Sequence, residues 1–69
     1  MREIEISTEY IKLDQFLKLC EIAQTGGHAK LLIQDGLIRV NGETCLARGK
    51  KLRKDDIVEG PQGDKFIIK

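Results

Sequence analysis

The sequence has few of the residues that build disulfide scaffolds, metal centres or membrane spans. Two cysteines and one histidine, His28, are too few for a disulfide framework or a four-ligand zinc site, so no metal and no cofactor are expected. The longest stretch without a charged residue is Ile22 to Ala29, far shorter than the roughly 20 apolar residues of a membrane helix. Glu3 and Glu5 interrupt any apolar run of a signal peptide. We therefore expect a cytoplasmic protein with no membrane contact.

Residues for catalysis and for base stacking are also scarce. The chain has no nucleophile–histidine–acid set, no P-loop and no carboxylate pair in an evidently apolar pocket. It is thus not expected to be an enzyme or to bind a small-molecule substrate. Aromatic residues make up 4% of the chain, and Phe16 and Phe66 fit internal positions, which leaves Tyr10 as the one ring expected at the surface.

What the chain does contain is enough for one small folded domain, residues 1–69. It is 41% hydrophobic and 33% charged with a net charge of +1, too apolar and too balanced for a disordered segment. Sixty-nine residues cannot support two independent cores.

The charge is distributed unevenly along the chain. Residues 39–54 hold six basic residues and one acidic residue, whereas the segments before and after them are neutral or mildly acidic. Five of the seven residues from Arg48 to Lys54 are basic. Such a run is often only a solvated loop, but its asymmetry is also typical of a surface that binds a polyanion.

Hydrophobic spacing predicts the order strand, helix, helix and then several strands. Residues 2–6 alternate as a strand, residues 13 to about 22 have a helical stripe that includes a buried Cys20, and a second helix begins at Thr25, Gly26 or Gly27 and ends at Gly36. Asn41-Gly42 predicts a hairpin with Arg39 pointing outward, and residues 56–59 and 65–68 read as two further strands. The predicted class is α+β, with two packed helices against a small antiparallel sheet.

The start of the second helix is a second candidate site for an anion. Helix N-termini present free N–H groups, glycine lets a phosphate approach the backbone, and Lys30 can face the same side. An ordinary helix–helix turn explains the same residues equally well.

Three stretches together resemble the RNA-binding domain named after ribosomal small-subunit protein S-four, also called the alpha-L motif. They are Lys12-Leu13-Asp14-Gln15-Phe16-Leu17, the run from Ala29 to Gly42, and Asp56-Ile57-Val58. The chain is more particularly similar to the small stand-alone bacterial YaaA/YbcJ group, through residues 15–19, 26–30 and 48–52. The resemblance implies an RNA-binding, ribosome-associated protein whose partner is ribosomal RNA or a ribosomal particle.

The resemblance also implies which residues contact RNA. In the family, the starts of both helices and the adjoining strand and loop form one basic surface. Carried onto this chain, that surface consists of Lys12, Thr25, Gly26, Gly27, Lys30, Arg39, Arg48, Lys50, Lys51 and Arg53.

Two positions depart from the family pattern. Thr25-Gly26 stands where many members have serine followed by arginine, and Asp55 stands where a turn glycine usually precedes the aspartate. The missing arginine keeps a second function open, a protein-interaction adaptor that uses the same basic face on an acidic partner.

Overall fold

The computed structural model describes all 69 residues and contains two helices and seven short strands. In chain order they are β1 (Arg2–Ile4), β2 (Ile11–Lys12), α1 (Leu13–Leu19), α2 (Gly26–Gln34), β3 (Arg39–Val40), β4 (Glu43–Thr44), β5 (Lys51–Leu52), β6 (Ile57–Glu59) and β7 (Lys65–Ile68). The predicted α+β class is confirmed.

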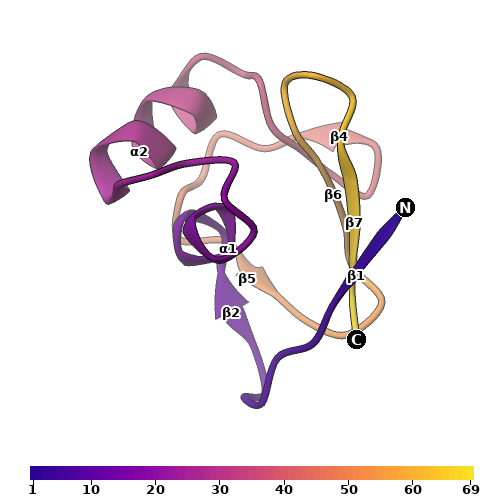
Figure 1. Ribbon diagram of the computed structural model, residues 1–69. Helices are drawn as coiled ribbons and strands as arrows, with labels where there is room; N and C mark the ends of the chain where they lie inside the picture. Colours follow the sequence, from indigo (N-terminus) through magenta and orange to yellow (C-terminus); the bar gives the residue numbers. More distant parts are fainter.

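The strands form two sheets, and this differs from the single antiparallel sheet that we predicted. The larger sheet has the order β1-β7-β6-β3-β4, and its β1–β7 pair is parallel while the other pairs are antiparallel. The smaller sheet is the antiparallel pair β2–β5. Figure 1 shows both helices to one side of the larger sheet, with β2 and β5 below α1.

The core lies between these elements. Helix α1 contacts α2, and the ring of Phe16 in α1 meets the ring of Phe66 in β7 edge to face, with centroids 6.1 Å apart. An edge-to-face pair of this kind stabilises a core beyond the area that it buries. The core consists of thirteen buried residues, Leu13, Phe16, Leu17, Cys20, Ala23, Ala29, Ile33, Ile38, Val40, Leu52, Val58, Phe66 and Ile68.

Helix α1 ends at Leu19, three residues before the predicted end near Ile22. The cause is a left-handed backbone at Glu21, where φ is 66°. A residue in this conformation cannot continue a right-handed helix. The chain turns there toward α2, and Ala23 becomes buried.

Helix α2 and the hairpin follow the predicted local signals. Gly36 has φ 73°, and the N–H groups of Gly36 and Leu37 donate to the carbonyls of Ile33 and Leu32, which is the Schellman arrangement of a glycine-terminated helix. Asn41 (φ 53°) and Gly42 (φ 84°) form the two-residue turn between β3 and β4, with Val40 opposite Glu43. Both central residues have positive φ, as a type I′ turn requires.

Candidate nucleic-acid interface

The β2–β5 pair places four side chains close together on the surface, two from each strand segment. Ile11 is opposite Leu52 and Lys12 is opposite Lys51, and of these Leu52 is fully buried while Ile11 packs against the core. Because side chains alternate along a strand, the neighbours of Ile11 and Leu52 face outward. We call these outward residues the basic ribbon: Tyr10, Lys12, Lys51 and Arg53.

Two backbone hydrogen bonds attach residues 48–54, which we call the basic segment, to the start of α1. The N–H of Leu13 donates to the carbonyl of Lys50 at 2.8 Å, and the N–H of Asp14 donates to the carbonyl of Arg48 at 3.1 Å. These are N–H groups that a helix leaves without an internal acceptor. The two N–H groups therefore position the basic segment. Because the bonds use only the backbone of that segment, its side chains are available to bind a ligand.

A side-chain network fixes the other end of the basic segment. The Asp56 carboxylate accepts from the N–H of Arg53 at 2.8 Å and from Asn41 Nδ2 at 3.1 Å, and Asn41 Oδ1 accepts from the N–H of Ile57 at 2.9 Å. The network joins the β3–β4 turn to the end of the ribbon. Sequence reasoning used Asn41 only as a turn signal and did not predict its contact with Asp56, which is fifteen residues away.

Two of the three cations of the ribbon lie over the Tyr10 ring, and none of the three has a carboxylate within 4.0 Å. Lys51 Nζ is 4.8 Å and Arg53 Cζ is 5.9 Å from the ring centroid, within the range of cation–π contacts. The one ion pair of the molecule within 4.0 Å joins Lys69 and Glu3, which lie outside the ribbon. The ribbon therefore has positive charge that no carboxylate of the chain neutralises at close range.

Helix α2 presents a second group of donors at its first turn. Thr25 caps the helix, since its Oγ1 accepts from the N–H of His28 at 3.0 Å, and His28 Nδ1 accepts from the N–H of Gln24 at 3.4 Å. His28 thus has a capping role. The N–H groups of Gly26 and Gly27 have no acceptor in the protein, and Lys30 is exposed on the same helix.

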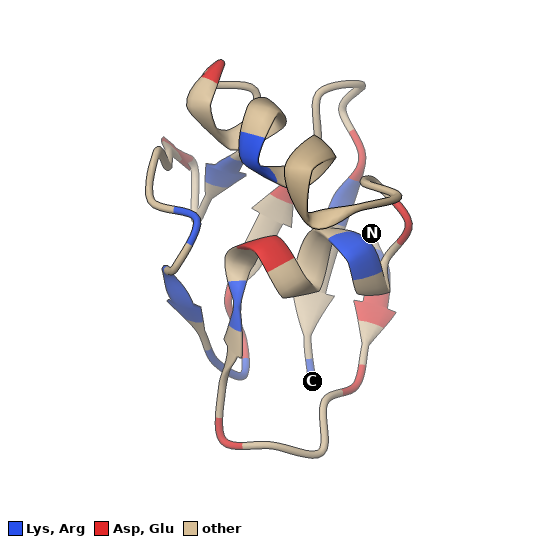
Figure 2. Ribbon diagram, turned by 90° about the vertical axis from the view of Figure 1, so that its left-hand side faces the viewer, with Lys and Arg blue, Asp and Glu red and all other residues tan.

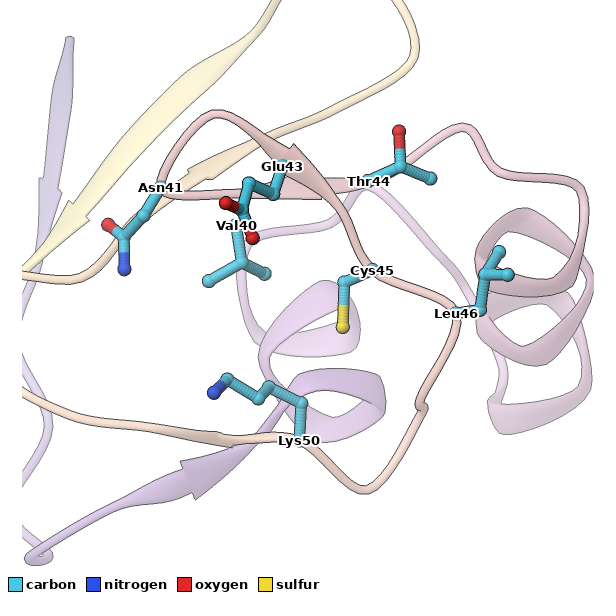
Figure 3. Close-up of a pocket in the computed structure, with 7 residues that line it drawn as sticks. All are labelled: Val40, Asn41, Glu43, Thr44, Cys45, Leu46 and Lys50. Carbon is cyan, nitrogen blue, oxygen red and sulfur yellow. The ribbon is translucent and has the colours of Figure 1, made fainter.

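Two of the predicted RNA-contacting residues, Arg39 and Lys50, belong neither to the basic ribbon nor to the start of α2. Arg39 is in β3, where it alternates with the buried Val40 and is opposite Thr44 and Glu59, so its side chain lies on the face of the larger sheet away from the core. Lys50 lines an open hollow of about 440 Å³ beside the β3–β4 hairpin. In Figure 3 its amino group points toward Val40, Asn41 and Glu43. A common role for these residues and the ribbon stays a prediction.

The structure brings Lys12, Lys51 and Arg53 together in the ribbon, with Arg48 bound through its backbone to the start of α1. Thr25, Gly26, Gly27 and Lys30 form the start of α2. Figure 2 shows β2 and both helices in front of the larger sheet, with blue segments around the β2–β5 pair on the left and much of the red on the right-hand side. Tyr10 is the ribbon residue that sequence reasoning did not assign to the site, although it was expected at the surface.

No group of three or more histidine, cysteine or acidic side chains is arranged to hold a metal ion. Neither helix is long and apolar enough to cross a membrane.

Residues 4–69 match the sequence pattern of the S4 domain. The chain belongs to the S4 domain family. A relative in Bacillus subtilis (strain 168), described as "Probable ribosome maturation protein RlbA", is 46% identical over 56 residues. The matched region is 81% of this chain and 79% of that relative, so the similarity extends over most of both chains.

The structure shows what the two departures from the S4 family pattern, at Asp55 and at Thr25-Gly26, change locally. Asp55 has φ 73°, so the turn keeps the left-handed backbone that glycine adopts easily, and its N–H donates to the carbonyl of Ile68 at 2.7 Å. Thr25-Gly26 leaves the first turn of α2 without an arginine but with two free N–H groups.

Proposed function

We propose that this S4 protein is a non-catalytic RNA-binding protein that contacts structured ribosomal RNA, or a ribosome-assembly intermediate, through the basic ribbon and the start of α2. The observation that carries the proposal is the group formed by Lys12, Lys51 and Arg53, three exposed cations with no carboxylate partner within 4.0 Å. Neutralising phosphates with Lys and Arg releases counterions, and this release dominates nucleic-acid affinity.

The first turn of α2 supports the same function. A Cβ added at Gly26 would meet no atom of the protein within 4 Å, and one at Gly27 would meet only Thr25 Oγ1 at 3.9 Å. Packing within the chain therefore does not require glycine at either position. An absent side chain does let a phosphate reach the backbone N–H groups, and the helix dipole favours its negative charge.

The relatives support an RNA or ribosomal partner. The S4 domain is the RNA-binding module that the sequence resembles, and the name of the Bacillus subtilis relative refers to ribosome maturation. A cytoplasmic location agrees with this partner.

A protein-interaction adaptor is the second candidate. It is favoured by Thr25-Gly26 in place of serine and arginine, which removes one cation from the start of α2. The same basic face would then bind an acidic protein surface.

Binding to protein-free ribosomal RNA and to intact ribosomal particles, measured side by side, separates the two functions. The RNA-binding function predicts salt-sensitive binding to both. The adaptor predicts no binding to protein-free RNA, because its partner is an acidic protein surface. If the protein binds neither the RNA nor the particles, the RNA-binding function is contradicted.

A further inference from the structure

The side of the ribbon next to Tyr10 has features that a phosphate-binding surface does not need. Tyr10 is 36% exposed although it is a large aromatic residue, and the cations of Lys51 and Arg53 lie over its ring. Lys and Arg side chains are sufficient to bind the phosphates of an RNA backbone. Phosphate binding therefore does not explain why an aromatic ring is exposed at this site. An exposed ring beside phosphate donors is typical of sites where an unpaired base stacks.

A hollow lies near Tyr10, lined by its neighbour Glu9 and by Arg53 but not by Tyr10 itself. It has a volume of about 480 Å³, within the range of roughly 300–1,000 Å³ for small-ligand sites. Arg53 belongs to both features, since its guanidinium lies over the ring and its side chain also lines the hollow. The hollow is lined by Ile6, Ser7, Thr8, Glu9, Arg53 and Lys54.

The chemistry of the hollow matches a nucleotide better than a lone phosphate. Arg53 and Lys54 supply cations for a phosphate, and the hydroxyl groups of Ser7 and Thr8 can hydrogen-bond a ribose or a base edge. Thr8 Oγ1 donates to the backbone carbonyl of Tyr10 at 2.8 Å, which links the hollow to the backbone of Tyr10. The Glu9 carboxylate repels a phosphate but can accept from an amino group of a base.

The two cations over the ring come from β5 and from the residue that follows it. With both cations in place, Tyr10 is still 36% exposed. We infer that Tyr10 is a stacking site for one unpaired RNA nucleotide, whose phosphate is bound by Arg53 with the neighbouring Lys51 and Lys54, and whose sugar and base edge occupy the hollow. This inference rests on the proposed RNA-binding function and adds that the bound RNA offers an unpaired nucleotide at the ribbon.

The composition of the chain supplies a direct probe. Tyr10 is the only tyrosine and there is no tryptophan, so intrinsic fluorescence reports this ring alone. The parent protein is titrated with an RNA hairpin that has an unpaired purine loop and with a blunt RNA duplex of the same nucleotide number. Labelled-RNA anisotropy measures binding independently, and free N-acetyltyrosinamide corrects for absorption by the RNA.

We expect the hairpin to quench more than half of the Tyr10 emission at saturation, and the duplex to bind without comparable quenching. Tyr10→Leu should weaken hairpin binding about tenfold, as expected for the loss of one stacked base, and weaken duplex binding by a much smaller factor. Tyr10→Phe keeps the ring and should retain hairpin affinity. Thermal unfolding of both variants checks that the fold is intact.

Two results would overturn the stacking site while the RNA-binding function stands. One is salt-sensitive hairpin binding by the parent with undiminished Tyr10 emission, and the other is equal hairpin affinity for the parent and Tyr10→Leu. If the parent binds neither RNA, the proposed function fails and the stacking site fails with it.

Discussion

Three non-glycine residues have a left-handed backbone, and each stands where the chain changes direction. They are Glu21 (φ 66°) after α1, Asn41 (φ 53°) in the hairpin turn and Asp55 (φ 73°) before β6. Asn and Asp tolerate this conformation better than other L-residues because their short polar side chains can hydrogen-bond locally. Asp55 also places a negative charge two residues from Arg53, so it affects both the turn and the ribbon.

Substitution of Asp55 separates these two effects. Asp55→Gly removes the left-handed strain and should stabilise the fold by up to about 1 kcal/mol, whereas Asp55→Asn should change stability little. Both substitutions remove the charge and should strengthen RNA binding by a similar factor. Urea unfolding and RNA titration of the two variants test this, and a Gly variant less stable than the parent by more than about 1 kcal/mol would contradict the turn geometry.

Cys20 is a buried thiol at the end of α1. It is 5% exposed, and burial raises the pKa of the thiol above its ordinary value of 9.0. Well below pH 9 the thiol keeps its proton in both the folded and the unfolded chain, so there the raised pKa has no effect on stability. As pH rises from about 9 through the raised pKa, the unfolded chain loses the proton first, and the free energy of unfolding therefore falls.

The free energy of unfolding of the parent should thus decrease between pH 8 and pH 10.5 relative to that of Cys20→Ala, which lacks the thiol. Urea unfolding at several pH values measures this difference, and the alanine variant serves as the reference for all other groups that titrate in the range. Parallel pH profiles for the two proteins would contradict the burial of Cys20.

At the scale of elements, the first turn of α2 has a composition that weakens the helix. Glycine is costly in helices because it loses more conformational freedom than alanine, and neither Gly26 nor Gly27 is required by packing. The proposed function supplies a reason for the pair, namely access of a phosphate to free N–H groups.

Replacing both glycines with alanine should therefore raise stability by roughly 1 kcal/mol and lower RNA affinity, because the added methyl groups obstruct the approach of a phosphate. Gln34→Ala at the other end of α2 is the control, and it should leave RNA affinity unchanged. Thermal unfolding and RNA titration are made on the same preparations. If the double variant binds RNA as tightly as the parent, the glycine pair does not bind a phosphate and serves only as the start of the helix.

The elements differ in how well the sequence predicts them. Helix α2 and the β3–β4 hairpin were predicted because their signals are local: Thr25 at the start, Gly36 at the end and Asn41-Gly42 at the turn. The parallel β1–β7 pair and the β2–β5 pair were not predicted, since each joins segments about forty or more residues apart through strands of two to four residues. Such short strands have too little periodicity to specify a partner.

In the candidate site, too, local features were predicted and long-range contacts were not. Its basic residues were recognisable from charge and family resemblance, but their grouping depends on long-range pairing. The register of Lys12 with Lys51 assembles the ribbon, whereas Lys50, the residue before Lys51, turns toward the hairpin hollow. Neighbouring residues of one basic run therefore have different surroundings, which charge counting does not reveal.

At the scale of the whole molecule, a net charge of +1 conceals a separation of charge. The segment 39–54 is strongly basic, while much of the acidic charge lies in segments 1–21 and 55–69. A molecule with this distribution attracts a polyanion to one side and presents acidic groups elsewhere, which orients the encounter. The central claim is that the ribbon supplies the phosphate contacts of this encounter.

The most direct test is the salt dependence of ribosomal RNA affinity for three proteins: the parent, Lys12→Ala/Lys51→Ala in the ribbon, and Lys65→Ala/Lys69→Ala outside it, which removes the same charge. For about five phosphate contacts, the slope of log affinity against log salt should be roughly −3.5 to −4.5 in the parent. The ribbon variant should have a slope flatter by about 1.4 to 1.8, and the control variant should keep the parent slope. Equal slopes in all three proteins, or an affinity of the parent that does not change with salt, would contradict the assignment of the ribbon as the phosphate-binding surface.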